Sequence, residues 1–290
     1  MYTVFKFGGA SIRDVENIIN VGDILSSYDS DKLVIVFSAM GKVTNMLEDV
    51  LEAYVQRNTD PFIVLKEVKD FHENILNDLF DEKHVIFDEI NNLFVEIEWV
   101  LEEEPNQNYA YDYDQIVSIG EFLSTKIMGA YLQQIGFDNS ILDARDLIKT
   151  DNSYRNAKVD WEQTTSCIKK HVKEIHCITQ GFIGCTSENF TTTLGREGSD
   201  FSAAILAFSL RAKEVVIWKD VPGMMNSDPN HFENAQLLQR IPFDEAIELA
   251  YFGAKVIHPK TIQPLKKKQI PLFIKSFLDP TSKGSEITEV

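Results

Sequence analysis

Short runs of apolar and β-branched residues recur along the whole chain, with longer segments of helical character between them. The runs cover residues 4–7, 33–37, 141–142, 175–179, 215–218 and 271–274. Strands separated by helices form parallel sheets, because each crossover needs a dozen or more residues and its helix then covers a face of the sheet. The pattern therefore predicts an α/β fold with a mainly parallel central sheet.

Helices are predicted between these strands and in one long insertion. From residue 43 to residue 104 strand signals are scarce, and apolar residues at helical spacing predict a helical layer that Pro105 ends. Further helices are predicted at residues 121–134, 199–212, 243–251 and 259–268. We expect Ser199 to cap the second of these helices and Pro259 to occupy the first turn of the last.

Composition and charge restrict the classes of partner. The 290 residues are 44% hydrophobic and 25% charged, as expected for one compact globular unit. A formal net charge of −17 repels phosphate backbones and anionic lipids, so we expect neither nucleic acid nor a membrane as partner. The three cysteines match no disulfide or metal-site spacing, and the N-terminus lacks a signal-peptide pattern. These features favour a cytoplasmic protein without a resident metal site.

Two glycines follow the first predicted strand, in the sequence Lys6-Phe7-Gly8-Gly9. Glycines let backbone N–H groups approach a ligand closely, and a helix start after them would suit a phosphate. An ordinary turn is the alternative, and Lys6 would then be a solvated edge residue. In either case Lys6 is expected to be exposed or to face a ligand, so that its removal leaves the fold intact.

A polar stretch from residue 187 to residue 199 is predicted to be a long loop, and long ordered loops are often functional. Arg196 and Gly198 lie at its end, and Asp200 follows near the N-terminal end of a predicted helix. The planar fork of an arginine can hold a carboxylate through two hydrogen bonds. A glycine-rich loop with an aspartate at a helix start would explain the same residues without a ligand.

Other candidate residues stand at further predicted strand ends and helix starts. Ser38 and Thr44 provide hydroxyl groups after the second strand. Glu121 would either complement the dipole of its helix or bind an ammonium group. Lys255 lies in an apolar stretch where a buried cation would need an anion such as a nucleotide phosphate, whereas His258 is expected to cap or pack.

Six segments, taken in order, resemble the catalytic domain of aspartate kinases, which are members of the amino acid kinase family. The segments are residues 6–11, 38–45, 120–121, 179–184, 191–200 and 251–259. The resemblance implies a three-layer α/β/α sandwich. Its N-terminal lobe, to about residue 185, would bind aspartate, and its C-terminal lobe, from about residue 186, would bind ATP with Mg²⁺. Family members commonly dimerise, so the resemblance also implies a homodimer.

The resemblance further implies a role for each matching residue. Lys6, Asp200 and Lys255 would be catalytic, with Asp200 orienting the lysines. Arg196 would hold a carboxylate of L-aspartate and Glu121 its ammonium. The substrate-binding residues would be Ser38, Thr44, Glu121, Phe182, Arg196 and Ser199. The nucleotide-binding residues would be Lys6, Gly8, Gly9, Gly198, Lys219, Asp220, Met225 and Lys255.

Five positions depart from the family pattern. The departures are Ala10 for threonine, Glu197 for glycine, Lys219 for threonine, Pro222 for aspartate and Met225 for tyrosine. Most of them bear on the nucleotide side of the site. Glu197 adds a negative charge beside a site for two anions.

The reaction implied is transfer of the γ-phosphoryl group of ATP to the β-carboxylate of L-aspartate, which opens the route to lysine, threonine and methionine. A β-carboxylate is ionised at neutral pH, with an ordinary pKa of about 3.9, so the nucleophile needs no general base. Kinases of the same family for glutamate, N-acetylglutamate, carbamate or a nucleoside monophosphate are alternatives, as is a non-catalytic regulator. Because the chain ends at Val290 without the paired ACT domains of typical aspartate kinases, we expect no feedback inhibition by lysine or threonine within the chain.

Overall fold

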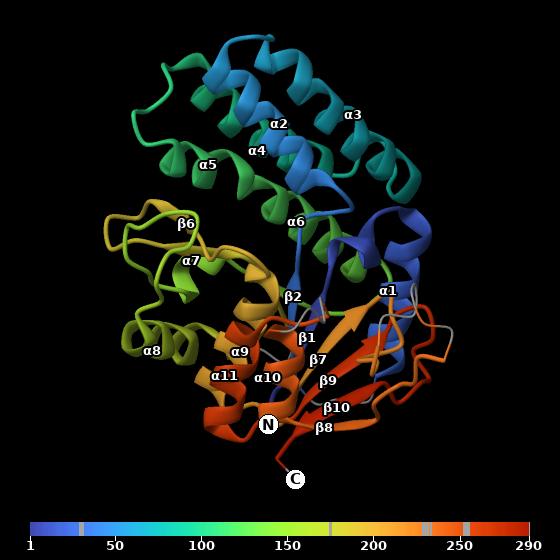
Figure 1. The fold of residues 1–290 in the computed structure, drawn as a ribbon. Helices are drawn as coiled ribbons and strands as arrows, with labels where there is room; N and C mark the ends of the chain where they lie inside the picture. The colour runs from blue at the N-terminus through green and yellow to red at the C-terminus, as the bar shows by residue number, and fades with distance from the viewer. Residues whose placement is uncertain (29–31, 174–175, 228–231, 233, 252–255, 290) are drawn as a thin grey trace.

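The computed structural model describes residues 1–28, 32–173, 176–227, 232, 234–251 and 256–289. Its main sheet has eight strands: β1 (Thr3–Phe7), β2 (Leu33–Phe37), β3 (Ser140–Leu142), β4 (His176–Gln180), β7 (Glu214–Lys219), β8 (Arg240–Pro242), β9 (Leu272–Ser276) and β10 (Ser285–Thr288). The spatial order is β3-β4-β2-β1-β7-β9-β10-β8, and every neighbouring pair is parallel except β9 with β10. The α/β fold and the mainly parallel sheet are confirmed (Figure 1).

Helices cover both faces of this sheet because its central strands are apolar on both sides. Phe5 and Phe7 pack in one buried cluster with α1 (Val15–Ser27) and α6 (Ile119–Gln134). Val4 and Val34 belong to a second cluster on the opposite face. The helices there are α8 (Trp161–His171), α9 (Gly198–Leu210), α10 (Phe243–Tyr251) and α11 (Pro259–Lys268). The layers are therefore helix, sheet and helix, as expected.

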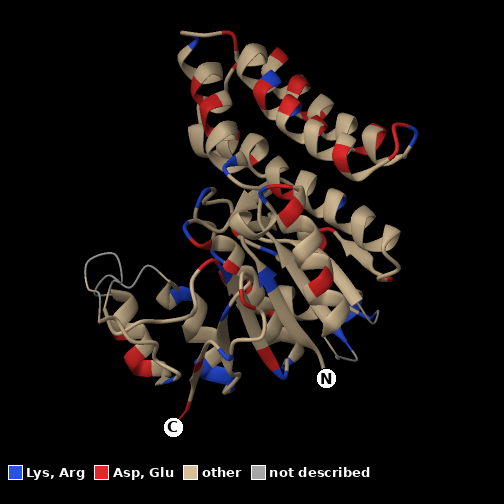
Figure 2. Cartoon of the chain, turned by 90° about the vertical axis from the view of Figure 1, so that its right-hand side faces the viewer, with Lys and Arg blue, Asp and Glu red and all other residues tan. Residues whose placement is uncertain are grey.

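The predicted insertion is helical and forms one end of the molecule. Its helices are α2 (Val43–Gln56), α3 (Pro61–Leu79) and α4 (Ile86–Glu102), and α5 (Tyr109–Val117) follows them. Figure 1 shows these helices gathered above the sheet. In Figure 2, Asp and Glu positions are frequent along them, whereas several Lys and Arg positions lie where they meet the edge of the sheet.

The expected loop at residues 187–199 is partly wrong. Residues Thr191–Thr193 form strand β6, which pairs with β5 (Ile183–Cys185) as a separate antiparallel ribbon. All three threonines are buried, and Thr192 and Thr193 hydrogen-bond to distant side chains, Thr150 and Asp114. A polar stretch becomes a buried strand here because tertiary partners satisfy its hydroxyl groups.

Three expectations about helix starts have different outcomes. Pro259 occupies the first turn of α11, and the Nδ1 atom of His258 caps that helix by accepting from the Lys260 amide at 3.1 Å. Ser199, in contrast, does not cap α9. That helix begins at Gly198, and Glu197 stands at the capping position with φ of 54° and no capping side-chain bond. The expected α-helix after Gly9 is only a short 3₁₀ turn, η1 (Gly9–Ile12).

The short helix α7 (Ala144–Leu147) completes the elements. Cys167 and Cys185 are free thiols, and Cys177 is buried. Among the described residues, no helix is both long and apolar enough to cross a membrane.

Candidate active site

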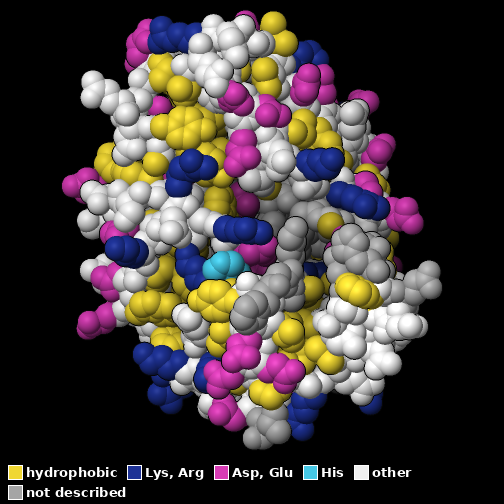
Figure 3. All heavy atoms as spheres, viewed as in Figure 1, with side chains coloured by type: hydrophobic (Ala, Val, Ile, Leu, Met, Phe, Trp, Pro, Cys, Tyr) yellow, Lys and Arg dark blue, Asp and Glu magenta, His cyan; other side chains and the backbone are white. Residues whose placement is uncertain are grey.

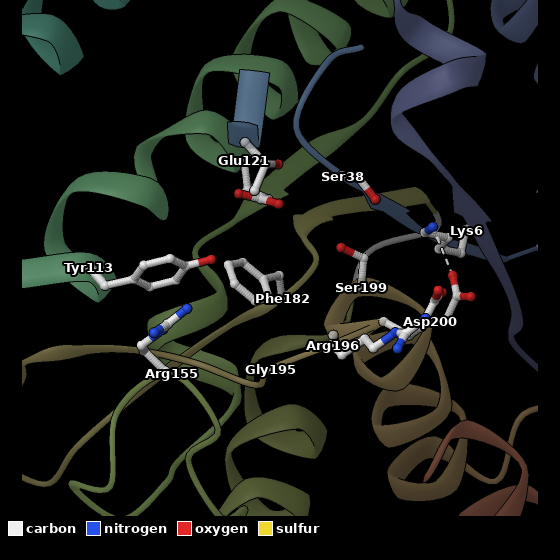
Figure 4. Close-up of a pocket in the computed structure, with 13 residues that line it drawn as sticks. Lys6, Ser38, Tyr113, Glu121, Arg155, Phe182, Gly195, Arg196, Ser199 and Asp200 are labelled. Carbon is white, nitrogen blue, oxygen red and sulfur yellow. Dashed lines mark ion pairs between the residues drawn. The ribbon is translucent and has the colours of Figure 1, made fainter. Parts of the chain in front are cut away.

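A cavity of 470 Å³ lies between the helical insertion and the C-terminal edge of the central strands. Parallel strands end at the same edge of a sheet, so residues near the ends of β1, β2 and β4 meet here. The cavity is lined by Lys6, Ser38, Thr44, Tyr113, Glu121, Arg155, Phe182, Gly195, Arg196, Glu197, Gly198, Ser199 and Asp200. Figure 3 shows this face of the molecule hollowed near its middle, and Figure 4 shows the cavity in close-up.

A chain of alternating charges borders the cavity. The Nζ atom of Lys6 lies 2.7 Å from Asp200 Oδ1, and the Nζ atom of Lys219 lies 3.2 Å from Asp200 Oδ2. Lys219 also approaches Glu197, at 3.8 Å. Lys6 is only 7% exposed and Asp200 only 1%, so these charges interact in a weakly screened environment.

Asp200 is a stable anion in this setting. Burial by itself would raise the pKa of Asp200, but the ammonium groups of Lys6 and Lys219 outweigh burial and lower the pKa to about 2. The carboxylate therefore stays charged at neutral pH and holds two ammonium groups at the edge of one cavity. Such a paired cation centre is suited to a polyanionic ligand.

The two glycines after β1 lie close to neighbouring groups, and Gly9 meets backbone atoms where a side chain would clash. A Cβ atom on Gly8 would lie 3.3 Å from the Lys6 Nζ atom, and one on Gly9 would lie 2.7 Å from the Ala39 carbonyl oxygen. Gly8 thus leaves room for the Lys6 ammonium group, and Gly9 lets the residue 38–41 turn pack against β1. The N-terminus of α9 lies at the cavity, where its residues Gly198 and Ser199 line the wall.

Glu121 provides a buried carboxyl group on the wall formed by the start of α6. It is 3% exposed, and its Oε2 atom has no hydrogen-bond partner among the described residues. Burial raises the pKa of Glu121 to about 8, against the lowering effects of the Ala39 backbone, its own backbone and the charge of Lys6. An unpartnered buried acceptor of this kind is costly, and a ligand with N–H donors would satisfy it.

Arg196 and Ser199 face the cavity from the loop before α9 and from its first turn. Ser199 packs so tightly on Gly181 that a Cβ atom there would lie 2.6 Å from the Ser199 Oγ atom. Arg196 is exposed and forms no ion pair with any described residue. Its guanidinium group is therefore available to an anion.

Phe182 forms the floor between these groups, with φ of 67°. Its amide donates to Ser202 Oγ at 2.9 Å, and its carbonyl accepts from the Leu194 amide at 2.8 Å. A Cβ atom on Gly198 would lie 2.5 Å from the Phe182 ring, so glycine is needed there. The left-handed backbone of Phe182 is held by its neighbours rather than by its own preference.

Comparison with known proteins agrees with this geometry. The sequence profile of the amino acid kinase family matches residues 1–276. The chain belongs to the amino acid kinase family.

Relatives within this family include aspartokinases. The chloroplastic aspartokinase 3 of Arabidopsis thaliana is 34% identical over 296 residues, which cover 98% of this chain and 52% of that protein. The structure of Escherichia coli aspartokinase III in complex with aspartate and ADP is similar with a TM-score of 0.92 and 33% identity. That match covers 100% of this chain and 65% of the other. The chain thus spans about half to two thirds of the length of these relatives.

A more distant member of the fold is the UMP kinase of Bacillus anthracis, with a TM-score of 0.54 and 11% identity over 99% of this chain. At that identity the similarity shows the amino acid kinase fold alone.

Most of the residues expected from the sequence to form the site line this one cavity. They are Lys6, Ser38, Thr44, Glu121, Phe182, Arg196, Gly198, Ser199 and Asp200. They come from segments far apart in sequence, and the fold brings them together. Their individual roles remain predictions.

Other expected site residues do not line the cavity. Lys219 forms ion pairs with Asp200 and Glu197, which line the cavity, but does not line it itself. Asp220 is exposed directly after β7, and Met225 forms an isolated antiparallel bridge with Leu237. Lys255 lies outside the described residues.

Two departures from the family pattern are neighbours in space. Glu197 stands where the family commonly has glycine and Lys219 where it commonly has threonine, and their charged groups lie 3.8 Å apart. Part of the extra negative charge is therefore offset by the extra positive charge. The left-handed φ of Glu197, 54°, is one that glycine adopts without strain.

Sequence reasoning missed three residues that line the cavity, Tyr113, Arg155 and Gly195. Arg155 belongs to the polar segment between β3 and α8, which carries no motif. No sequence motif indicates a role for its neighbour Asp114, a buried acid in α5. Only the folded chain brings α5, this loop and β6 together.

Proposed function

We propose that this chain is the catalytic unit of an aspartate kinase, which transfers the γ-phosphoryl group of ATP to the β-carboxylate of L-aspartate. The proposal rests above all on the order of charges across the cavity. Figure 4 shows Glu121 on one wall and the Lys6–Asp200 pair on another, with Phe182 and Ser199 between them. An amino acid with an acidic side chain matches this order, because its ammonium can meet Glu121 while its carboxylate approaches the lysines.

The reaction needs little covalent chemistry from the protein. An oxygen of the β-carboxylate attacks the γ-phosphorus, and the bond from that phosphorus to the bridging oxygen of ADP breaks. The products are 4-phospho-L-aspartate and ADP, and no proton is transferred. Lys6 and the backbone N–H groups at the start of α9 would stabilise the charge on the transferring group, and Asp200 would hold Lys6 in place.

ATP is proposed as the donor because the related E. coli aspartokinase III was solved with aspartate and ADP. On this chain, Lys6 and Lys219 would face its phosphates. Among the described residues, no group of three or more His, Cys, Asp or Glu could hold a metal ion. Mg²⁺ commonly binds through substrate phosphates, water and one or two carboxylates, so it would arrive with the nucleotide. A homodimer remains a prediction.

An acyl-phosphate assay tests the proposal directly. The purified chain is incubated with Mg-ATP, hydroxylamine and one acceptor at a time, and the hydroxamate and ADP are measured. L-aspartate is expected to give both products, whereas L-glutamate, N-acetyl-L-glutamate, carbamate and UMP are expected to give ADP at background rate. Preferred turnover of another acceptor would assign the chain to a different kinase of the family.

Calorimetry distinguishes an aspartate kinase from a second candidate, a non-catalytic regulator. The departures from the family pattern at Glu197 and Met225 would favour that candidate. Binding of L-aspartate and Mg-ADP without hydroxamate formation would support that alternative. Turnover with L-aspartate would exclude it.

Binding of L-aspartate is expected to release a proton. At pH 7 a carboxyl group whose pKa is about 8 is roughly nine-tenths protonated, and the incoming ammonium would lower the pKa of Glu121 and expel that proton. Because Glu121 must lose its proton when L-aspartate binds, the affinity for L-aspartate should rise with pH below pH 8, by up to about tenfold per pH unit. Calorimetric titration at pH 7 in phosphate and in Tris would measure the release, because these buffers differ in their heat of ionisation.

Glu121→Gln provides the control for this experiment. The amide keeps the shape of the side chain but carries no titrating proton, so the buffer dependence should vanish and L-aspartate should bind more weakly. Equal heats in both buffers for the unmodified chain would show that Glu121 does not exchange its proton for the substrate ammonium.

A further inference from the structure

Arg155 presents a cation to the cavity from a loop that is held in an unusual conformation. Tyr154 and Arg155 have φ of 48° and 51°, and residues other than glycine rarely adopt such backbone angles. Such a conformation is strained, and it persists only where the surrounding structure imposes it.

The buried carboxylate of Asp114 imposes this conformation. The Arg155 amide donates to both of its oxygens, at 3.1 and 2.9 Å. Thr193 donates to the same carboxylate through its amide at 2.8 Å and its hydroxyl at 2.6 Å. Asp114 is fully buried in α5, so one carboxylate ties together a helix, the Arg155 loop and strand β6.

The side chain of Arg155 is supported by aromatic rings. Its guanidinium lies 4.3 Å from the ring centre of Tyr113 and 5.5 Å from that of Tyr109. The Tyr113 hydroxyl donates to Glu48 at 2.8 Å, which fixes that ring. Within the described residues Arg155 forms no ion pair, and it is exposed at the rim of the cavity. A charged group that is held in place and forms no direct ion pair can bind an anion.

The position of Arg155 indicates which anion it meets. Figure 4 shows Tyr113 and Arg155 on the side of the cavity opposite to Lys6 and Asp200. A substrate whose β-carboxylate lies at Lys6 directs its α-carbon away from the lysines.

We propose that Arg155 is a specificity-determining residue that binds the α-carboxylate of the amino-acid substrate. This inference rests on the proposed function, because it uses the direction in which the substrate lies. Arg155 would act in addition to Arg196, the arginine assigned from the sequence, which Figure 4 shows next to Asp200. The pocket would then select free α-amino acids and discriminate against substrates whose α-carboxylate is neutralised.

Arg155→Gly is the sharpest test, because glycine accepts the left-handed backbone and loses only the side chain. Calorimetry without nucleotide is expected to show L-aspartate binding about tenfold more weakly to this variant than to the unmodified chain. The affinity for Mg-ADP and the melting temperature should not fall. Arg155→Lys should bind L-aspartate with intermediate affinity, since it keeps the charge but not the planar fork.

Lys158→Ala is the matched control, since Lys158 is an exposed cation on the same loop that does not line this cavity. It should bind L-aspartate as the unmodified chain does. The α-amide of L-aspartate, which lacks the α-carboxylate charge, should bind equally to the unmodified chain and to Arg155→Gly.

Each contrary outcome has a separate meaning. Unchanged L-aspartate affinity in Arg155→Gly, or an equal loss of affinity for L-aspartate and its α-amide, would overturn the assignment of Arg155 and leave the proposed function standing. Failure of the unmodified chain to bind L-aspartate would overturn both.

Discussion

Replacing Lys6 by alanine is expected to lower turnover with L-aspartate about a thousandfold, as removal of one charge-stabilising donor does in other enzymes. The Lys6 ammonium group lies 2.7 Å from Asp200 at the cavity, where the transferring phosphoryl group would develop its charge. The loss should appear in kcat more than in KM for L-aspartate, because the interaction would strengthen in the transition state. Steady-state kinetics of ADP release would measure it.

The same variant should also lose stability, which corrects the expectation that an exposed Lys6 contributes little. Lys6 is 7% exposed and paired with a buried carboxylate. Breaking a buried ion pair costs about 3 to 5 kcal/mol, but Lys219 remains 3.2 Å from Asp200, so the loss should be smaller. Lys213→Ala, which removes an exposed lysine far from the cavity, should preserve both activity and stability. Undiminished turnover in Lys6→Ala would remove Lys6 from the mechanism.

Asp200→Asn is expected to have the largest effect on stability, about 3 kcal/mol or more in the free energy of unfolding at neutral pH. The amide keeps the size of the side chain but leaves Lys6 and Lys219 in a buried site without their shared anion. Turnover should fall as well, because both ammonium groups lose the group that positions them. Urea denaturation followed by circular dichroism would measure the stability, and coupled ADP release the activity.

The pH dependence of this effect follows from the pKa of Asp200, which is lowered from 3.8 to about 2. A lowered pKa means that the carboxylate contributes its full stability above pH 3.8 and loses it as the pH falls through about 2. The difference in stability between the unmodified chain and Asp200→Asn should therefore stay constant from about pH 5 to pH 8. Asp70→Asn, which breaks an exposed ion pair with Lys66, should change stability by less than about 1 kcal/mol. Equal stability of Asp200→Asn and the unmodified chain would contradict a structural role for the charge cluster.

Much of the site could be predicted because chemistry in a parallel sheet concentrates where strands end. Lys6 lies on β1, Ser38 follows β2, and Phe182 follows β4. Since these strands are parallel neighbours, their C-terminal ends meet without further information. Glu121 and Asp200 lie in the first turns of helices that pack over the same edge, and the resemblance of short segments selected both residues.

Other parts of the site depended on contacts that no local pattern records. Arg155 belongs to a loop that reads as an ordinary polar connection, and its orientation comes from Asp114, 41 residues earlier in the chain. Thr191–Thr193 reads as a loop but is buried as β6, because Asp114 and Thr150 supply the hydrogen-bond partners. Ser199 looks like a helix cap, yet it lies in the first turn of α9 and packs closely on Gly181.

The sequence by itself determined the α/β architecture and the helical insertion, because strand and helix periodicity reports which side chains are buried. The resemblance to aspartate kinases selected most residues of the cavity. The tertiary structure alone decided how the charges are paired. Lys219 meets Asp200 and Glu197, Glu121 remains without a partner for one oxygen, and Arg155 faces the cavity. Electrostatic interactions depend on distance and burial in three dimensions, and neither quantity is a function of spacing along the chain.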